Sequence, residues 1–355
     1  MNRTALTLPD LTRILRDCAG EDESVNLDGD ILDTPFAELG YDSLALLETA
    51  ARLERQLDVS LSEEEVGRAT TPRLLLELAN ATAGALPSAD PAPQGPAGGR
   101  GSVLVTGGTS GIGLAVVELL AGTGRPVFLC ARDGERLALT LKSLRERGLE
   151  VDGTVCDVRS RAQVTAFVAA AVARYGPVEV LVNNAGRSGG GVTAELSDET
   201  WYDVIDTNLN GVFLMTREVL TAGGMRERGH GRIVNIASTG GKQGVVLGAP
   251  YSASKHGVVG LTKALGLELA GSGITVNAVC PGYVETPMAQ QVRGNYARIW
   301  GVDEQAVLDR FEAKIPLGRY TTPQEVAALV GHLVGDLAAA ITAQALNVCG
   351  GLGNY

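Results

Sequence analysis

The sequence predicts two folded units, a small α-helical bundle followed by an α/β domain built on a doubly wound, seven-stranded parallel sheet. The chain has 355 residues, enough for about two domains, and 45% of them are apolar, enough to fill two cores. Apolar residues recur with helical spacing before residue 87. After residue 100, short β-rich runs alternate with helical stretches.

The two predicted units are separated by residues 87–100. This segment contains four of the chain's 14 prolines and three glycines, with no large apolar side chain. It cannot bury a face, so we expect an exposed linker rather than an ordered loop within one domain. The charge balance changes at the same place. Residues 1–86 hold 17 acidic and 7 basic side chains, whereas the rest of the chain holds 24 acidic and 23 basic ones. We therefore expect domains at 1–86 and 101–355.

Three stretches of the first unit have helical apolar spacing. Leu8, Leu11 and Leu15 share one face, residues 44–57 repeat the period, and Thr71-Pro72 is a helix start signal. We expect a bundle of three or four helices in about 80 residues.

Seven β-rich runs in the second unit predict strands. They are continuous rather than alternating in apolar character, which is typical of parallel strands buried on both faces. The predicted strands are Val103–Thr106, Val127–Cys130, Gly153–Cys156, Val178–Val182, Arg232–Ile236, Ile274–Val279 and Ala345–Val348.

Composition excludes several classes of function. The net charge of −11 gives no basic surface for a nucleic acid. The cysteines are odd in number and lack paired spacing, which favours buried thiols over disulfides, and the three histidines have no companions at metal-ligand spacing. No run of 18 apolar residues occurs. We expect a soluble, cytoplasmic protein that binds no nucleic acid, membrane or metal.

The motif Gly40-Tyr41-Asp42-Ser43-Leu44 lies where an acidic loop meets the second predicted helix. A simple N-cap, a position that serine favours, is the alternative role for Ser43. In an acidic helical unit of this size, the motif resembles the acyl carrier proteins, most closely those of bacterial aromatic polyketide synthases, over about residues 5–84. The resemblance implies a 4'-phosphopantetheine arm on Ser43, added by a phosphopantetheinyl transferase. Helix N-termini favour phosphate, in agreement with that role.

A glycine-rich turn, Thr106–Gly113, follows the first predicted strand of the second unit and opens a helix. Glycines there permit a tight turn, backbone approach to a pyrophosphate and close helix packing. After the second strand, Ala131 and Arg132 stand where an NAD enzyme commonly places an acid. Arg132 can pair with a 2′-phosphate, so we expect NADPH; a solvated surface charge is the alternative.

Polar motifs also follow the later strands. Asn183-Asn184-Ala185-Gly186 closes the fourth strand, Asn208 lies in the next helix, and Ser238 follows the fifth strand. Tyr251 stands four residues before Lys255. With the glycine turn, these motifs resemble the short-chain dehydrogenase/reductase family over essentially the whole second unit, which implies a Rossmann fold.

The spacing of Tyr251 and Lys255 puts them on one helix face. The ammonium of Lys255 should therefore lower the pKa of the Tyr251 phenol from about 10 toward the working pH, so that Tyr251 acts as general acid. The resemblance implies that Ser238 binds the carbonyl oxygen, Lys255 holds the nicotinamide ribose and Asn208 supports a proton-supplying water chain. It also implies cofactor contacts from Gly107, Thr109, Ser110, Gly111, Ile112, Gly113, Arg132, Asp157, Val158, Asn184, Gly186, Tyr251, Lys255, Pro281, Gly282, Val284 and Thr286.

Four further segments resemble the ketoreductases of type II aromatic polyketide pathways. They are Arg187–Gly191, the insert from about Met288 to Lys314, the Ser-Thr-Gly-Gly-Lys-Gln-Gly run from Ser238 to Gly244, and the C-terminal Cys-Gly-Gly-Leu-Gly-Asn-Tyr. Ser188 departs from that group, which usually has proline there. The resemblance implies a substrate pocket at Arg187, Ser188, Gly189 and Tyr296.

Both units point to one pathway type. The leading interpretation is a carrier fused to an NADPH-dependent ketoreductase that reduces one carbonyl of a carrier-bound poly-β-ketone, with ketosynthase, cyclase and phosphopantetheinyl transferase as partners. Related reductases commonly form tetramers and Leu337–Tyr355 carries no charge, so we expect a homotetramer. One alternative is a fatty-acid β-ketoacyl reductase with a carrier, which the long insert disfavours. Another is a carrier or docking protein on a non-catalytic scaffold, which the complete set of Asn208, Ser238, Tyr251 and Lys255 disfavours.

Overall fold

The computed structural model describes residues 6–19, 27, 29, 31–42, 45–46, 48–50, 52–53, 61, 63–84 and 101–353. The chain divides into two compact units, Met1–Pro96 and Ala97–Tyr355. The predicted linker, residues 87–100, lies entirely outside the described residues, so its boundaries stay predictions. Among the helices of the described ranges, none has the length and hydropathy that a membrane span needs.

The smaller unit is helical, as predicted. It contains α1 (Leu8–Ala19), α3 (Glu63–Arg68) and α4 (Pro72–Gly84), with further helical residues at 45–46, 48–50 and 52–53. The predicted apolar faces meet in one core, where Leu11, Leu15 and Leu75 are at most 1% exposed. The two ends of the unit are joined by paired hydrogen bonds, because the backbone N–H of Leu6 donates to Asn80 and the Asn80 amide donates to the carbonyl of Leu6.

The larger unit contains the predicted sheet of seven parallel strands, in the order β3-β2-β1-β4-β5-β6-β7. The strand ends agree with the prediction to within two residues. The sixth strand is longer than predicted because it pairs with the last strand as far as Pro281 and Val348. The strands are β1 (Ser102–Thr106), β2 (Val127–Ala131), β3 (Val151–Val155), β4 (Val178–Asn183), β5 (Gly231–Ile236), β6 (Ile274–Pro281) and β7 (Ala345–Val348).

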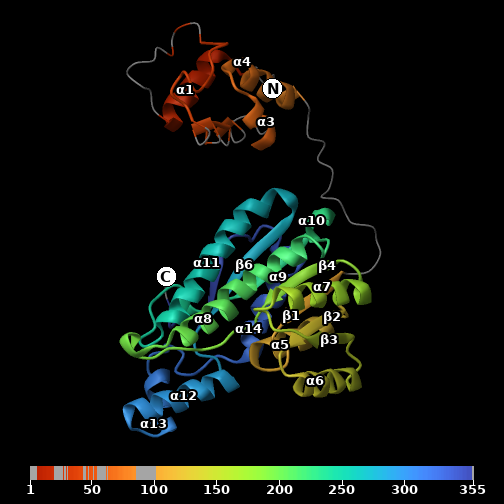
Figure 1. Ribbon diagram of the computed structural model, residues 1–355, viewed down its shortest axis with the longest axis vertical. Helices are drawn as coiled ribbons and strands as arrows, with labels where there is room; N and C mark the ends of the chain where they lie inside the picture. The colour runs from red at the N-terminus through yellow and green to blue at the C-terminus, as the bar shows by residue number, and fades with distance from the viewer. Residues whose placement is uncertain are drawn as a thin grey trace. The chain divides into compact units, whose positions relative to one another are not determined.

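Helices cover both faces of this sheet (Figure 1). Helices α5, α6 and α14 pack on one face and α7, α9 and α11 on the other, while α12 and α13 lie together at one end of the unit, outside these layers (Figure 1). The helices are α5 (Gly111–Gly122), α6 (Gly134–Glu146), α7 (Arg161–Tyr175), α8 (Asp198–Ile205), α9 (Gly211–Leu220), α10 (Met225–Arg228), α11 (Ala249–Leu269), α12 (Pro287–Trp300), α13 (Glu304–Glu312) and α14 (Pro323–Leu333).

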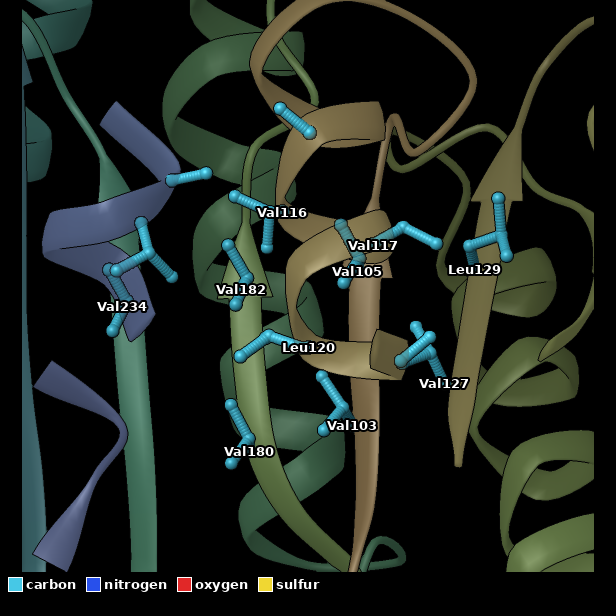
Figure 2. Close-up of a cluster of buried hydrophobic side chains, with 14 of the residues drawn as sticks. Val103, Val105, Val116, Val117, Leu120, Val127, Leu129, Val180, Val182 and Val234 are labelled. Atoms are coloured by element: carbon cyan, nitrogen blue, oxygen red, sulfur yellow. The ribbon is translucent and has the colours of Figure 1, made fainter. Parts of the chain in front are cut away.

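Side chains of β1 and β4 alternate between the two helical layers. Figure 2 shows Val103, Val105 and Val182 packed beside Val116 and Leu120 of α5. The intervening strand residue, Leu104, belongs to the core on the opposite face. Burial on both faces explains the continuous apolar runs from which the strands were predicted.

The position of β1 determines where a ligand can bind. It lies between β2 and β4, so the strand order reverses there. In open α/β sheets, ligands bind in the crevice at the carboxyl ends of the strands beside such a reversal. The polar motifs predicted from the sequence follow the carboxyl ends of β1, β2, β4 and β5 and therefore meet at this edge.

A tight contact between β2 and β3 gives a test of the fold. A Cβ atom at Gly153 would collide with the carbonyl oxygen of Leu129 on the neighbouring strand, whereas Gly122, at the end of α5, has open space. Gly153→Ala should lower the free energy of unfolding by about 1–3 kcal/mol. Gly122→Ala should raise it by about 0.5 kcal/mol. Both tryptophans, Trp201 and Trp300, lie in the larger unit, so urea unfolding followed by their fluorescence reports on that unit. Equal stabilities of the two variants would contradict the close approach.

Candidate active site

The glycine-rich turn is fixed against β4 by hydrogen bonds. The side-chain amide of Asn184 donates to the carbonyls of Thr106 (2.9 Å) and Gly107 (3.0 Å), and Gly107 has a left-handed backbone with φ of 65°. A Cβ atom at Gly113 would collide with the Gly107 carbonyl. Ser110 precedes α5 without capping it through its side chain. At its glycines the turn has no side chains over its backbone, which lies close to the helix N-terminus. This arrangement fits a pyrophosphate.

The residues predicted to contact the adenosine part of a cofactor lie at the ends of β2 and β3. Arg132 is exposed directly after β2. Asp157 is bound by Arg159, with 2.6 Å between Oδ2 and Nη2, and these hydrogen bonds lower the pKa of the Asp157 carboxyl. The side chain of Val158 is only 5% exposed and belongs to the core, so a cofactor contact from this residue must come from its backbone.

Ser238, Tyr251 and Lys255 come together where β5 ends and α11 begins. The Ser238 hydroxyl accepts from the backbone N–H of Gly240 (3.0 Å), and a Cβ atom at Gly240 would lie 3.3 Å from both the Ser238 hydroxyl and the Tyr251 ring. The Lys255 Nζ lies 5.9 Å from the centre of the Tyr251 ring and donates to the carbonyl of Ile236 (2.7 Å). The sequence therefore predicted this group correctly as neighbours.

The predicted pKa shift of Tyr251 is wrong in direction. Burial raises the pKa of the Tyr251 phenol, and the hydrogen bond with Ser238 lowers it by less than burial raises it. Burial also lowers the pKa of Lys255 from 10.5 to about 8. Helical spacing brings the two residues close, but the prediction omitted the desolvation that both side chains undergo in this position.

Asn208 lies in a π-helical turn, Asp206–Asn210, between α8 and α9 rather than in a regular helix. Such turns are frequent at functional sites. Asn208 is completely buried, and its side chain binds both the N–H (2.8 Å) and the carbonyl (3.0 Å) of Arg187 and donates to the Ser254 hydroxyl (3.1 Å). Asn208 therefore fixes the segment after Gly186 against α11.

The predicted nicotinamide segment follows β6. The backbone N–H of Gly282, after Pro281, donates to the Val348 carbonyl (3.0 Å), and Val284 pairs with Thr321. Thr286 caps α12, and its methyl group would lie 3.0 Å from a Cβ atom at Gly111. The glycine-rich turn and this segment are therefore neighbours. Thr109, Ser110 and Ile112, in the turn and the first turn of α5, are all partly exposed at the same edge.

The predicted substrate residues come from two segments, the loop after β4 and helix α12. The Arg187 guanidinium pairs with Asp203 and reaches the Ser188 carbonyl, and Gly189 packs close to Val204. Tyr296 comes from α12, and its hydroxyl donates to the carbonyl of Val246 (2.9 Å). Its ring also packs against Trp300 and Phe311.

The carrier motif is described only in part. The Asp42 carboxylate accepts from the backbone N–H of Ala45 (2.9 Å), so Asp42 is the residue that caps the helical segment beginning there. Ser43 lies outside the described residues, and its role as attachment site stays a prediction.

Two side-chain pairs were missed by sequence reasoning, one between two buried cysteines and one between the buried Arg293 and the exposed Glu285. Cys130 and Cys156, on neighbouring strand ends, interact through their thiols, and this hydrogen bond raises the pKa of Cys130 and lowers that of Cys156. Arg293 and Glu285 form an ion pair. No periodicity or motif links either pair, because strand pairing and helix packing bring their members together. The four described cysteines are all free and buried, as predicted.

The chain was compared with known families and solved structures. Residues 102–297 match the short chain dehydrogenase family, and residues 13–79 match the phosphopantetheine attachment site family. Ketoacyl reductase 1 of the granaticin polyketide synthase of Streptomyces violaceoruber is 70% identical over 252 residues, covering 71% of this chain and 93% of that protein. The acetoacetyl-CoA reductase of Rhizobium meliloti is 40% identical over 248 residues, covering 70% of this chain and 96% of that protein.

A solved structure shares the fold of the larger unit. A variant of actinorhodin polyketide ketoreductase, crystallised with NADPH, has 67% sequence identity and a TM-score of 0.71, and the match covers 72% of this chain and 98% of that one. The family match, the identities and the fold agree with the geometry of the catalytic group. The chain belongs to the short chain dehydrogenase family, and a phosphopantetheine-carrier unit precedes its reductase unit.

Proposed function

We propose that this protein is a carrier-fused ketoreductase that reduces one carbonyl of a carrier-bound poly-β-ketone in aromatic polyketide biosynthesis. The observation that carries the proposal is the meeting of Ser238, Tyr251 and Lys255 beside the crevice at β1. The 70% identity to a polyketide synthase ketoacyl reductase, against 40% to an acetoacetyl-CoA reductase, supports the polyketide branch.

NADPH is the cofactor we infer for the crevice. The glycine-rich turn that ends at Gly113 would hold the pyrophosphate, and Arg132 would hold the 2′-phosphate. Val284 and Thr286 would border the nicotinamide, and Lys255 would hold its ribose. When bound, NADPH supplies the hydride that reduces the carbonyl carbon.

Each catalytic side chain has a distinct task at the carbonyl oxygen. The Ser238 hydroxyl donates a hydrogen bond to that oxygen, and Tyr251 donates the proton that completes the alcohol. Because burial raises the pKa of Tyr251, the phenol stays protonated at neutral pH, which is the state that a general acid requires. Asn208 holds the neighbouring Arg187 backbone in place and would support the water chain that returns a proton to Tyr251.

The carrier unit supplies the substrate in this proposal. A phosphopantetheinyl transferase loads Ser43, a ketosynthase extends the chain on the arm, and a cyclase acts on the reduced product. We also propose a homotetramer, in which the uncharged C-terminal segment Leu337–Tyr355 contributes to a subunit contact.

A test of the reductase compares two ketones with NADPH, bicyclic decalone and an acetoacetyl thioester. The wild-type chain should reduce decalone, and Tyr251→Phe should lower kcat by about 100-fold or more while NADPH binding is unchanged, because only the proton donor is lost. Tyr202→Phe, which alters a tyrosine 61% exposed on α8, is the control and should keep full activity. Turnover of the thioester alone would favour a fatty-acid reductase, and undiminished turnover in Tyr251→Phe would refute the catalytic assignment.

A test of the carrier uses intact mass spectrometry after incubation with coenzyme A and a phosphopantetheinyl transferase. The wild-type chain should gain the mass of one phosphopantetheine group, because its motif offers a single serine hydroxyl for the transfer. Ser43→Ala should gain none, and Ser60→Ala, a serine of the same unit outside the motif, should be loaded normally. Loading of Ser43→Ala would mean that another residue carries the arm.

The lowered pKa of Lys255 predicts a pH dependence of stability. Between pH 8 and 10.5 the folded chain binds fewer protons at Lys255 than the unfolded chain does, so this group makes stability rise with pH in that window. Relative to Lys255→Met, wild type should therefore gain about 3 kcal/mol of unfolding free energy from pH 7 to pH 10.5. Urea unfolding followed by tryptophan fluorescence measures the difference. Lys263→Met, an exposed lysine of the same helix, is the control. An identical pH course for Lys255→Met and wild type would contradict the burial effect.

A further inference from the structure

Helix α12 buries a cation. Among its residues only Arg293 is buried, at 8% exposed. A charged side chain is almost never buried without a partner, because the loss of hydration must be offset. The partner of Arg293 is Glu285, which precedes the helix and lies between Val284 and Thr286, two of the predicted nicotinamide residues.

The ion pair has bidentate geometry. Nη1 and Nη2 of Arg293 each lie 2.8 Å from a different carboxylate oxygen of Glu285. The guanidinium also lies over the ring of Tyr320 at 5.4 Å, and that ring is 6% exposed. Hydrogen bonding to Arg293 lowers the pKa of the Glu285 carboxyl, so the pair stays charged at neutral pH. Such a planar pair fixes the relative orientation of the two side chains as well as the distance between them.

The backbone of Glu285 is itself held in place. Its N–H donates to the carbonyl of Thr321 (3.0 Å), whose own N–H donates to Tyr283 (2.9 Å). Thr286, the next residue, caps α12 through the N–H of Ala289 (3.2 Å) and adjoins the glycine-rich turn. The ion pair therefore connects α12 to the segment that borders the cofactor crevice.

One turn further along α12, Tyr296 contacts a second segment. Its hydroxyl binds the carbonyl of Val246, in the loop that follows Ser238. The adjacent Leu247 has a left-handed backbone, with φ of 59°, and its carbonyl accepts from the N–H of Gly191 (2.8 Å). A bulky residue held in this conformation is strained, so the surrounding contacts must maintain it. Helix α12 thus spans from the cofactor segment to the loops predicted to border the substrate.

We propose that Arg293 is a positioning residue that couples cofactor binding to the shape of the substrate pocket. Through Glu285, the segment that borders the nicotinamide determines the position of α12. Through Tyr296, that helix in turn determines the position of the loops around a bulky ketone. The proposal rests on the proposed function. By thermodynamic reciprocity, a bicyclic ketone then strengthens cofactor binding as much as the cofactor strengthens ketone binding.

The test measures this coupling without turnover. The Kd of NADP⁺ is measured by protein fluorescence with and without saturating decalone, in wild type, Arg293→Met and Arg319→Met. Arg319 is the matched control, because it makes a bidentate pair with Glu325 (3.0 and 2.7 Å) on the same unit at an exposed position. Decalone should tighten NADP⁺ binding in wild type and in Arg319→Met. In Arg293→Met the coupling should fall about tenfold, equivalent to about 1.4 kcal/mol.

Two further variants keep the test independent of folding defects. Arg293→Lys retains the charge but not the bidentate geometry, and Glu285→Gln removes the carboxylate; both should lose much of the coupling. Adding Glu285→Gln to Arg293→Met should cause no further loss, because the two residues act as one unit. In steady-state assays, KM for decalone should rise in Arg293→Met, with kcat for the acetoacetyl thioester nearly unchanged.

Several outcomes would overturn the proposal. Coupling in Arg293→Met and Arg293→Lys equal to that in Arg319→Met would do so, as would an equal loss of activity toward both ketones, which indicates general damage. Absence of coupling in wild type would also refute it. Failure of wild type to reduce any ketone would instead refute the proposed function, and the binding measurements on NADP⁺ would still decide the role of Arg293.

Discussion

The hydrogen bonds between the ends of β1 and β4 are the constraint on which the rest of the site depends. The hydroxyl of Thr106 accepts from the N–H groups of Asn184 (3.0 Å) and Ala185 (2.9 Å), while the Asn184 amide holds the glycine-rich turn. These bonds occur where the strand order reverses, which is where ligands bind in open α/β sheets. Gly186 follows directly and lies beside Asn208 and Lys255. The residues predicted to bind the cofactor and those predicted to act in catalysis are therefore both connected to the hydrogen bonds between β1 and β4.

Burial determines the protonation state of the catalytic pair. It pushes Tyr251 toward its neutral phenol and Lys255 toward its neutral amine, since both charged forms lose hydration. A phenol with a raised pKa is a weaker acid, but the base formed during ketone reduction is an alkoxide, comparable in basicity to hydroxide, whose conjugate acid has a pKa of about 15.7. The proton transfer from Tyr251 that we propose would therefore be downhill. The site suits proton donation in the reductive direction.

The sequence predicts the features that depend on local order along the chain. Each strand was found from its apolar run, and Tyr251 and Lys255 were found as neighbours because four residues span one helical turn. Features that depend on tertiary packing were not predictable in this way. The direction of the Tyr251 pKa shift follows from the burial of the phenol, and the pairing of Arg293 with Glu285 depends on how the chain enters α12 at Thr286. The π-helical turn at Asn208 likewise has no signal in a pattern of apolar residues.

The serine at position 188 illustrates how packing can replace a local restraint. Ketoreductases that this chain resembles usually have proline there, which fixes φ and stiffens the loop. Here the preceding residue supplies the restraint, because both backbone groups of Arg187 bind the buried Asn208 and its guanidinium binds Asp203. On the far side, the N–H of Gly191 is held by the strained Leu247. The segment is therefore fixed at both ends by groups whose own positions depend on α11 and on the loop after Ser238, so these contacts restrain it without a proline at position 188.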